Sequence, residues 1–157
     1  RNYNDTDDYP TNKEELNGPR GYFGLTVSQI LTPDTRLSVG GSVTRDEADL
    51  AGRRSWRYEA TASLTRIFES PIPKHTGPWS LSAIAKAAST PYDSPLASID
   101  PDVTREDTEW QLQLVGSVRL GENVSLVASG LYKQVDSTLT NYEYDNWAFT
   151  MGFAVQF

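Results

Sequence analysis

Charged and amide side chains recur at every second position in several segments of this 157-residue chain. Around residue 58, Arg57 and Glu59 alternate with Trp56 and Tyr58, and the same spacing returns further along the sequence. A period of two places side chains on one face of a β-strand. The residues assigned to one polar face are Arg57, Glu59, Lys86, Glu109, Gln111, Gln113, Arg119 and Lys133. Both signs of charge are present, so a ladder of ion pairs across neighbouring strands is expected.

Catalytic groups are scarce in this sequence. There is no cysteine, and the single histidine, His75, follows Lys74 in a predicted turn, where a solvated side chain is the favoured interpretation. Glu106 and Asp107 are adjacent on a predicted strand and so point to opposite faces, which prevents them from acting as a carboxylate pair. The sequence therefore predicts no catalytic residues and no enzyme.

Acidic residues gather in two predicted loop regions, near Asp5 to Asp8 and between Asp93 and Asp107. Oxygen-rich clusters of this kind can bind Ca²⁺ or Mg²⁺, but the spacing and the glycine of an EF-hand are missing. We interpret these acids as groups that keep loops solvated, and we expect no metal and no cofactor. The formal net charge of −7 argues against nucleic acid as a partner.

Seven segments alternate apolar and polar side chains and predict the elements that position these groups. In the last of them, Trp147, Phe149 and Met151 share one face with Phe153 and Val155. The predicted strands are 20–32, 35–46, a strand around 56–65, 78–91, a strand around 110–120, 124–135 and 144–157. Most exceed the five or six residues typical of soluble sheets and match the roughly ten tilted residues that cross a bilayer. No helix is predicted.

The connections alternate between long and short. Polar loops are expected at 47–54, 92–107 and 136–143, whereas 33–34, 70–77 and 121–123 are expected to be turns. Aromatic residues lie near both ends of the strands. Short turns on one side, long loops on the other and two aromatic girdles are typical of outer-membrane barrels. We predict an all-β, antiparallel up-and-down transmembrane β-barrel in the bacterial outer membrane, with membrane lipid against its apolar face. Residues 1–19 would be extracellular, and residues 20–157 would form the membrane strands.

A soluble fold is the structural alternative that stays open. A soluble β-sandwich or closed soluble barrel would use the same alternation with its apolar face turned inward.

The number of predicted strands is odd. Within the membrane interpretation this is unexpected, because bacterial single-chain barrels have even numbers of strands. We therefore expect the remaining barrel strands to come from an N-terminal part of the same protein or from a partner chain. Residues 1–19 carry many charges and no apolar face, so they are not expected to supply them.

The segment from Tyr144 to Phe157 resembles the terminal signal of outer-membrane proteins. In that class the last strand, ending in Phe, is recognised by the barrel assembly machinery. The resemblance assigns an assembly role to Phe157, Phe153 and Trp147, and it implies the assembly machinery as a partner.

A narrower resemblance covers roughly residues 35–157. The run Asp102-Val-Thr-Arg-Glu-Asp107 is similar to the Arg-x-Asp entry of a late strand in one barrel type, and Ser137 to Asp145 resembles the Ser-Asn…Tyr-x-Tyr-Asp stretch before its final strand. Thr138 stands where that pattern has Asn. These motifs resemble the C-terminal barrel of surface lipoprotein assembly modifiers and related proteins linked to tetratricopeptide repeats. The resemblance implies a barrel of more than seven strands that moves cargo to the cell surface, although this chain contains no helical repeat.

Two functions follow from these expectations. The polar face could line a transport or secretion conduit, or it could be a salt-bridged wall inside a narrow barrel. In the second case the protein would be an outer-membrane anchor or display scaffold whose loops bind a partner.

Overall fold

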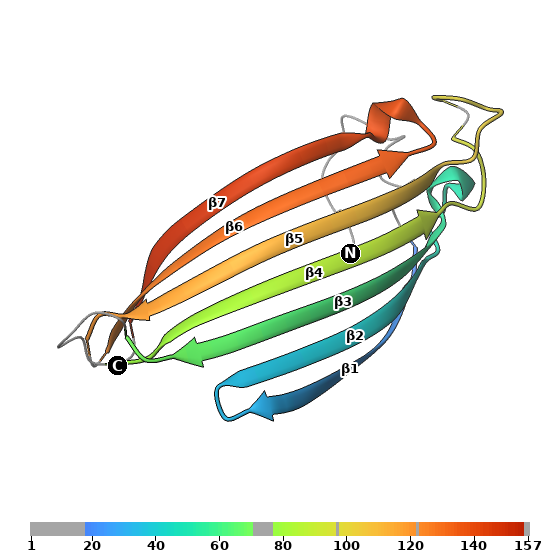
Figure 1. Ribbon diagram of the computed structural model, residues 1–157. Helices are drawn as coiled ribbons and strands as arrows, with labels where there is room; N and C mark the ends of the chain where they lie inside the picture. Colours follow the sequence, from blue (N-terminus) through green and yellow to red (C-terminus); the bar gives the residue numbers. More distant parts are fainter. Residues whose placement is uncertain (1–17, 71–76, 97, 122, 156–157) are drawn as a thin grey trace.

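The computed structural model describes residues 18–70, 77–96, 98–121 and 123–155. These residues form one seven-stranded sheet in which every strand pairs with the strand next to it in sequence (Figure 1). All six ladders are antiparallel. The strands are β1 (Arg20–Thr32), β2 (Thr35–Asp46), β3 (Ser55–Phe68), β4 (Trp79–Pro91), β5 (Glu106–Arg119), β6 (Val124–Ser137) and β7 (Tyr144–Val155). The prediction of an all-β, up-and-down meander is confirmed.

The strands run for 12 to 14 residues, as the alternation indicated. The bounds differ from the prediction mainly at the loop side of β5 and β6. There the ladder continues to the pair Asp107 and Ser137, beyond the last apolar residue of either strand. The Ser137 hydroxyl donates to Asp107 Oδ1 at 2.7 Å, so polar side chains extend the pairing where no apolar periodicity marks it.

The connections lie at two distinct ends of the sheet. Residues 47–54, 92–96, 98–105 and 138–143 lie at one, here called the loop end. Residues 33–34, 69–70, 77–78, 120–121 and 123 lie at the other, the turn end. Two loops contain a single 3-10 turn, Ala51–Arg53 and Thr140–Tyr142, which the strand pattern did not predict. The alternation of loops and turns is confirmed, because each connection joins neighbouring antiparallel strands.

The sheet is open. Among the described residues, β1 pairs only with β2 and β7 pairs only with β6, and Figure 1 shows these two strands at opposite edges of one curved layer. The prediction that these strands do not close a ring by themselves is therefore confirmed. The two packed sheets of a β-sandwich are not found in the described ranges either.

The apolar face of this sheet is uncovered. Phe23 is 76% exposed on β1 and Phe149 is 78% exposed on β7, and even on β5, an interior strand of the sheet, Leu114 is 50% exposed. No large side chain in the described part of the chain is fully buried. The five buried apolar residues lie at the loop end or on the opposite face: Ala48, Ala88, Leu96, Val135 and Leu139. This sheet therefore has no hydrophobic core of the kind that stabilises a soluble domain.

No helix in the described ranges is long and apolar enough to cross a membrane. Several sequence predictions lie outside those ranges: most of the 1–19 region, most of the 70–77 turn including His75, and the terminal Phe157.

Candidate functional site

Five of the eight predicted polar-face residues form a connected cluster, here called the charge ladder. The antiparallel register places directly paired residues side by side on the same face. One row across the sheet contains Glu59, Ala88 and Glu109, and the next row towards the turn end contains Lys86, Gln111 and Lys133. The ladder consists of Arg57, Glu59, Lys86, Glu109 and Lys133.

Opposite charges alternate along the whole charge ladder. Arg57 Nη2 lies 3.2 Å from a carboxylate oxygen of Glu59 and 3.2 Å from one of Glu109. The lysines extend the ladder on either side, with Lys86 Nζ 3.1 Å from Glu59 and Lys133 Nζ 3.1 Å from Glu109. Each acid therefore has two cationic partners. The ladder of opposite charges expected from the sequence is present, and it spans four adjacent strands from β3 to β6.

A small residue makes this arrangement possible. Arg57 on β3 and Glu109 on β5 are two strands apart, about 10 Å across the sheet. Between their strands lies Ala88 of β4, whose short side chain is 5% exposed beneath the ion pairs. Because Ala88 pairs directly with both Glu59 and Glu109, a longer side chain at this position would lie beside their carboxylates. Glu109 is correspondingly shielded, with its side chain 11% exposed.

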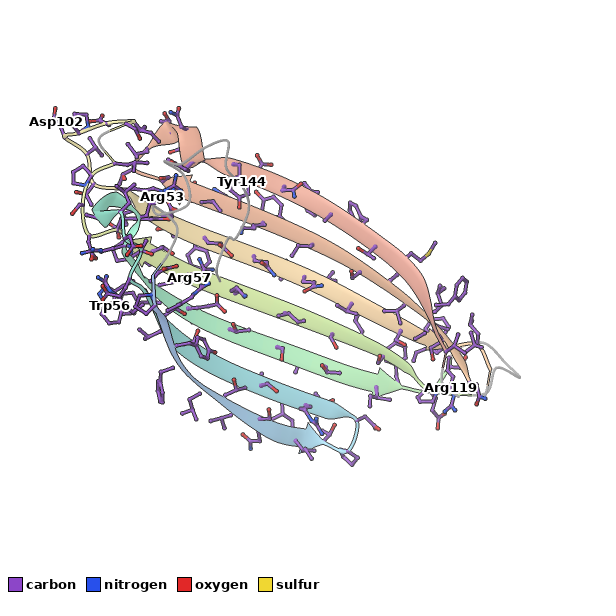
Figure 2. The ribbon with its side chains drawn as sticks, turned by 180° about the vertical axis from the view of Figure 1, so that it is seen from behind. Arg53, Trp56, Arg57, Asp102, Arg119 and Tyr144 are labelled. Carbon is purple, nitrogen blue, oxygen red and sulfur yellow. The ribbon has the colours of Figure 1, made fainter. Side chains whose placement is uncertain are left out.

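The other three predicted polar-face residues have different surroundings. Gln111 pairs directly with Lys86 on one side and Lys133 on the other, so it separates the two ammonium groups. Gln113 lies one row nearer the turn end. Arg119 belongs to the same face but lies at the turn end, where its Nε donates to the Gly121 carbonyl at 3.1 Å, far from the ladder (Figure 2).

The polar face is also less uniform than the sequence suggested. The row of Gln113 contains Ile84 and Leu131 as its direct neighbours, and a further row contains Val115. These apolar residues were not predicted to lie on this face. Their positions in the alternation were sufficient to find them, because each has the same parity as a polar-face residue on its strand. The turn-end half of the face is therefore mixed, and the charges gather towards the loop end.

The loops form a second ion-pair cluster around Arg45, which was not predicted as a site residue, and Asp93, which was predicted only as a solvated loop acid. Arg45 Nη1 donates to Asp93 Oδ1 at 2.7 Å, and Arg45 Nε donates to Glu47 at 2.8 Å. The guanidinium also lies 5.2 Å from the centroid of the Trp56 ring. Because Asp93 lies in the loop after β4 and Arg45 is the last residue but one of β2, this contact ties two loops together.

A second arginine fastens the next pair of loops. Arg105 lies over the rings of Tyr92 and Tyr142, at 4.7 and 3.4 Å from their centroids, and its Nε donates to Asp107 at 2.9 Å. Cation–π contacts of this type favour a fixed position for the guanidinium. In the same loops Leu96 and Leu139 are buried. The loop end is therefore an ordered cap rather than a set of independent loops.

The Arg45 contacts make the loop cap sensitive to acid. The hydrogen bonds that Arg45 donates hold the pKa of the Asp93 carboxyl below its usual range. They also lower the pKa of the Glu47 carboxyl. A lowered folded-state pKa stabilises the cap above the ordinary carboxyl range near ~4, and this contribution is lost as the pH falls through the lowered pKa. We expect the 92–105 loop to lose protection from hydrogen exchange below about pH 4.

Asp93→Asn should lower the hydrogen-exchange protection of the 92–105 loop already at neutral pH and abolish the further loss of protection in acid. Asp102→Asn should change neither. An unchanged acid step in Asp93→Asn would contradict this role for the Arg45 contact.

The geometry offers little for chemistry beyond charge pairing. No group of three potential metal ligands occurs among the residues that the structure places. The charge ladder is therefore a row of paired charges along one face of four strands.

Two of the three predicted assembly residues, Trp147 and Phe153 of β7, are among the described residues. They are 63% and 71% exposed on the apolar face.

No known protein family, curated protein or solved structure matches this chain. The resemblance to surface lipoprotein assembly modifiers therefore stays an expectation from the sequence.

Proposed function

We propose that this chain forms part of the wall of a bacterial outer-membrane β-barrel that acts as a transport or secretion conduit. Its apolar face contacts lipid, and its polar face, with the charge ladder, faces an aqueous interior. The remaining strands of the wall come from an N-terminal part of the same protein or from a partner chain.

The contrast between the two faces carries the proposal. Large apolar side chains such as Phe149 and Leu114 are half or more exposed, whereas Glu109 is shielded by its ion pairs. In water this arrangement would leave the greater part of the apolar surface hydrated and without a core. In a bilayer the same apolar face is solvated by hydrocarbon, and the paired charges are kept away from it.

A conductance measurement tests the conduit. Protein extracted from membranes with its natural partners is expected to conduct ions in a planar bilayer. Gln111→Glu places a carboxylate between Lys86 and Lys133. This variant should shift the reversal potential towards cation selectivity, because charges that line a pore act on permeating ions at short range.

Glu143→Gln changes the charge by one unit in the 138–143 loop, away from the ladder, and should have a smaller effect. The absence of conductance in protein that is stably inserted would contradict the conduit.

A display scaffold is the second candidate, and the loop cap favours it. The cap has its own buried residues and ion pairs, and a Cβ added at Gly52 would lie 2.9 Å from the Pro95 carbonyl oxygen. Loops packed this closely present a defined surface to a partner. A scaffold would insert into membranes without conducting.

Deletion of Phe157 tests the assembly signal implied by the C-terminal resemblance. We expect slower insertion in cells, because the terminal aromatic would be read by the assembly machinery. Refolding into detergent should change much less, since one residue is a small part of the lipid-facing area. Deletion of Asn2 provides a control for loss of one residue near the other end of the chain. Normal insertion in cells without Phe157 would contradict the assembly role.

A further inference from the structure

The two open edges of the sheet run in the same direction. Each of the six ladders is antiparallel, so β1, β3, β5 and β7 all run from the loop end to the turn end. A direct contact between β1 and β7 would therefore be a parallel pair. Such a pair would differ from every other pair in this sheet, and parallel pairing is slightly less stable per residue.

We propose that the edges of β1 and β7 are joined by an odd number of strands from sequence other than residues 18–155, in a wall that is antiparallel throughout. This inference rests on the proposed membrane function, because only in hydrocarbon does an uncovered edge carry a prohibitive cost. The number must be odd because β1 and β7 run in the same direction, and strand direction alternates across an antiparallel wall. The first and the last of the added strands must both run from the turn end to the loop end.

A second copy of this chain does not meet this requirement. Two copies inserted with their loop ends on the same side of the membrane meet through β7 of one and β1 of the other, which again makes parallel contacts. Pairing β1 with β1 of a second copy would be antiparallel, but it would place the two loop ends on opposite sides of the membrane. Only strands from a different sequence satisfy both the direction and the membrane orientation.

The added strands also have a defined side-chain pattern. Next to β1 they must place apolar residues beside Phe23, Leu25 and Val27 and small or polar residues beside Gly24 and Thr26. Residues 1–17 lack this pattern, because six charged side chains interrupt the stretch from Asp5 to Glu15. The partner is therefore a membrane strand segment with alternating apolar and polar residues.

Disulfide trapping separates this arrangement from closure by the chain itself, and the absence of native cysteine makes the experiment clean. The full protein is expressed in cells with one cysteine on β1, at position 24, 26 or 28, and one on β7, at position 148, 150 or 152. These nine combinations cover alternative registers on the polar face. Directly paired strand residues have Cα separations that a disulfide can span.

The control variant Ser129→Cys/Thr150→Cys joins direct partners on β6 and β7 and should form its disulfide in the membrane fraction. None of the nine test combinations should form a disulfide, either within one chain or between two. A β1–β7 disulfide in membrane-inserted protein would overturn the inference while leaving the membrane function intact. Recovery of the control disulfide only in soluble protein would instead contradict the proposed function.

Hydrogen exchange on the extracted protein shows whether the edges are covered. About half of the β1 amides point away from β2, because hydrogen-bonded and non-hydrogen-bonded positions alternate in an antiparallel ladder. These amides should be as protected as those that bond to β2. Rapid exchange at alternate β1 residues would mean that no strand covers the edge and would overturn the inference. A density map of the same material should show an even total number of strands, and an odd ring would contradict it equally.

Discussion

Replacing Leu114 with Arg is expected to cost about 2–4 kcal/mol of folding free energy in a bilayer, or to block membrane assembly. Leu114 lies near the middle of β5 on the apolar face and is 50% exposed in the described chain. If lipid covers this face, the guanidinium must leave water for hydrocarbon. The change in folding free energy can be measured by unfolding the protein in lipid vesicles, with the gel mobility of the folded form as the readout.

Gln113→Arg is the matched control, because it places the same side chain one residue away on the opposite face. Its direct neighbours are Ile84 and Leu131, but the long arginine stem can cover them while its charged group reaches water. We expect a change within about 1 kcal/mol, somewhat above the ~0.5 kcal/mol of an ordinary surface substitution. Equal tolerance of both variants would exclude lipid from the apolar face, and equal damage would indicate that both faces are buried.

The strands and their faces could be predicted from the sequence because one face carries nearly all the large apolar residues. Residues such as Trp110, Leu112 and Leu114 alternate with Gln111 and Gln113, and this leaves only one register that keeps the apolar side chains together. The structure follows that alternation through β2 to β7, whereas β1 shifts its register between Ile30 and Thr32. The prediction was weakest at strand ends, because the pairs that extend β5 and β6 are polar and carry no apolar signal.

The charge ladder was predictable as a face but not as a set of contacts. The parity of Arg57, Glu59 and Glu109 places them on one side of the sheet. Which acid meets which base depends on how β3, β4 and β5 are aligned, because Arg57 and Glu109 are 52 positions apart in sequence. It also depends on the short side chain of Ala88 on the strand between them. The Arg45–Asp93 contact was beyond sequence reasoning for a similar reason. It joins two irregular loops, whose path depends on tertiary packing rather than on a periodic pattern.

Glu109→Gln is expected to destabilise the protein by about 2–3 kcal/mol, because it removes the acid that joins two cations in the charge ladder. Glu109 is 11% exposed, and its loss leaves Lys133 without a counter-ion in the ladder and Arg57 with Glu59 alone. A fully buried pair would cost about 3–5 kcal/mol, but Lys133 and Arg57 are 27% and 28% exposed, so water offsets part of the loss. Urea unfolding in lipid vesicles measures the change.

Glu106→Gln removes the same charge from the same strand, at an exposed position without an ion pair in the described structure, and should change stability by less than about 0.5 kcal/mol. The double variant Glu109→Gln/Lys133→Gln supplies the sharper comparison. It removes the acid together with Lys133, the cation that Glu109→Gln alone leaves unpaired. The loss of stability in the double variant should therefore be smaller than the sum of the losses in Glu109→Gln and Lys133→Gln. Additive costs would mean that the 3.1 Å contact between Lys133 and Glu109 contributes no coupling, and the charge ladder would then be a solvated surface rather than a stabilised wall.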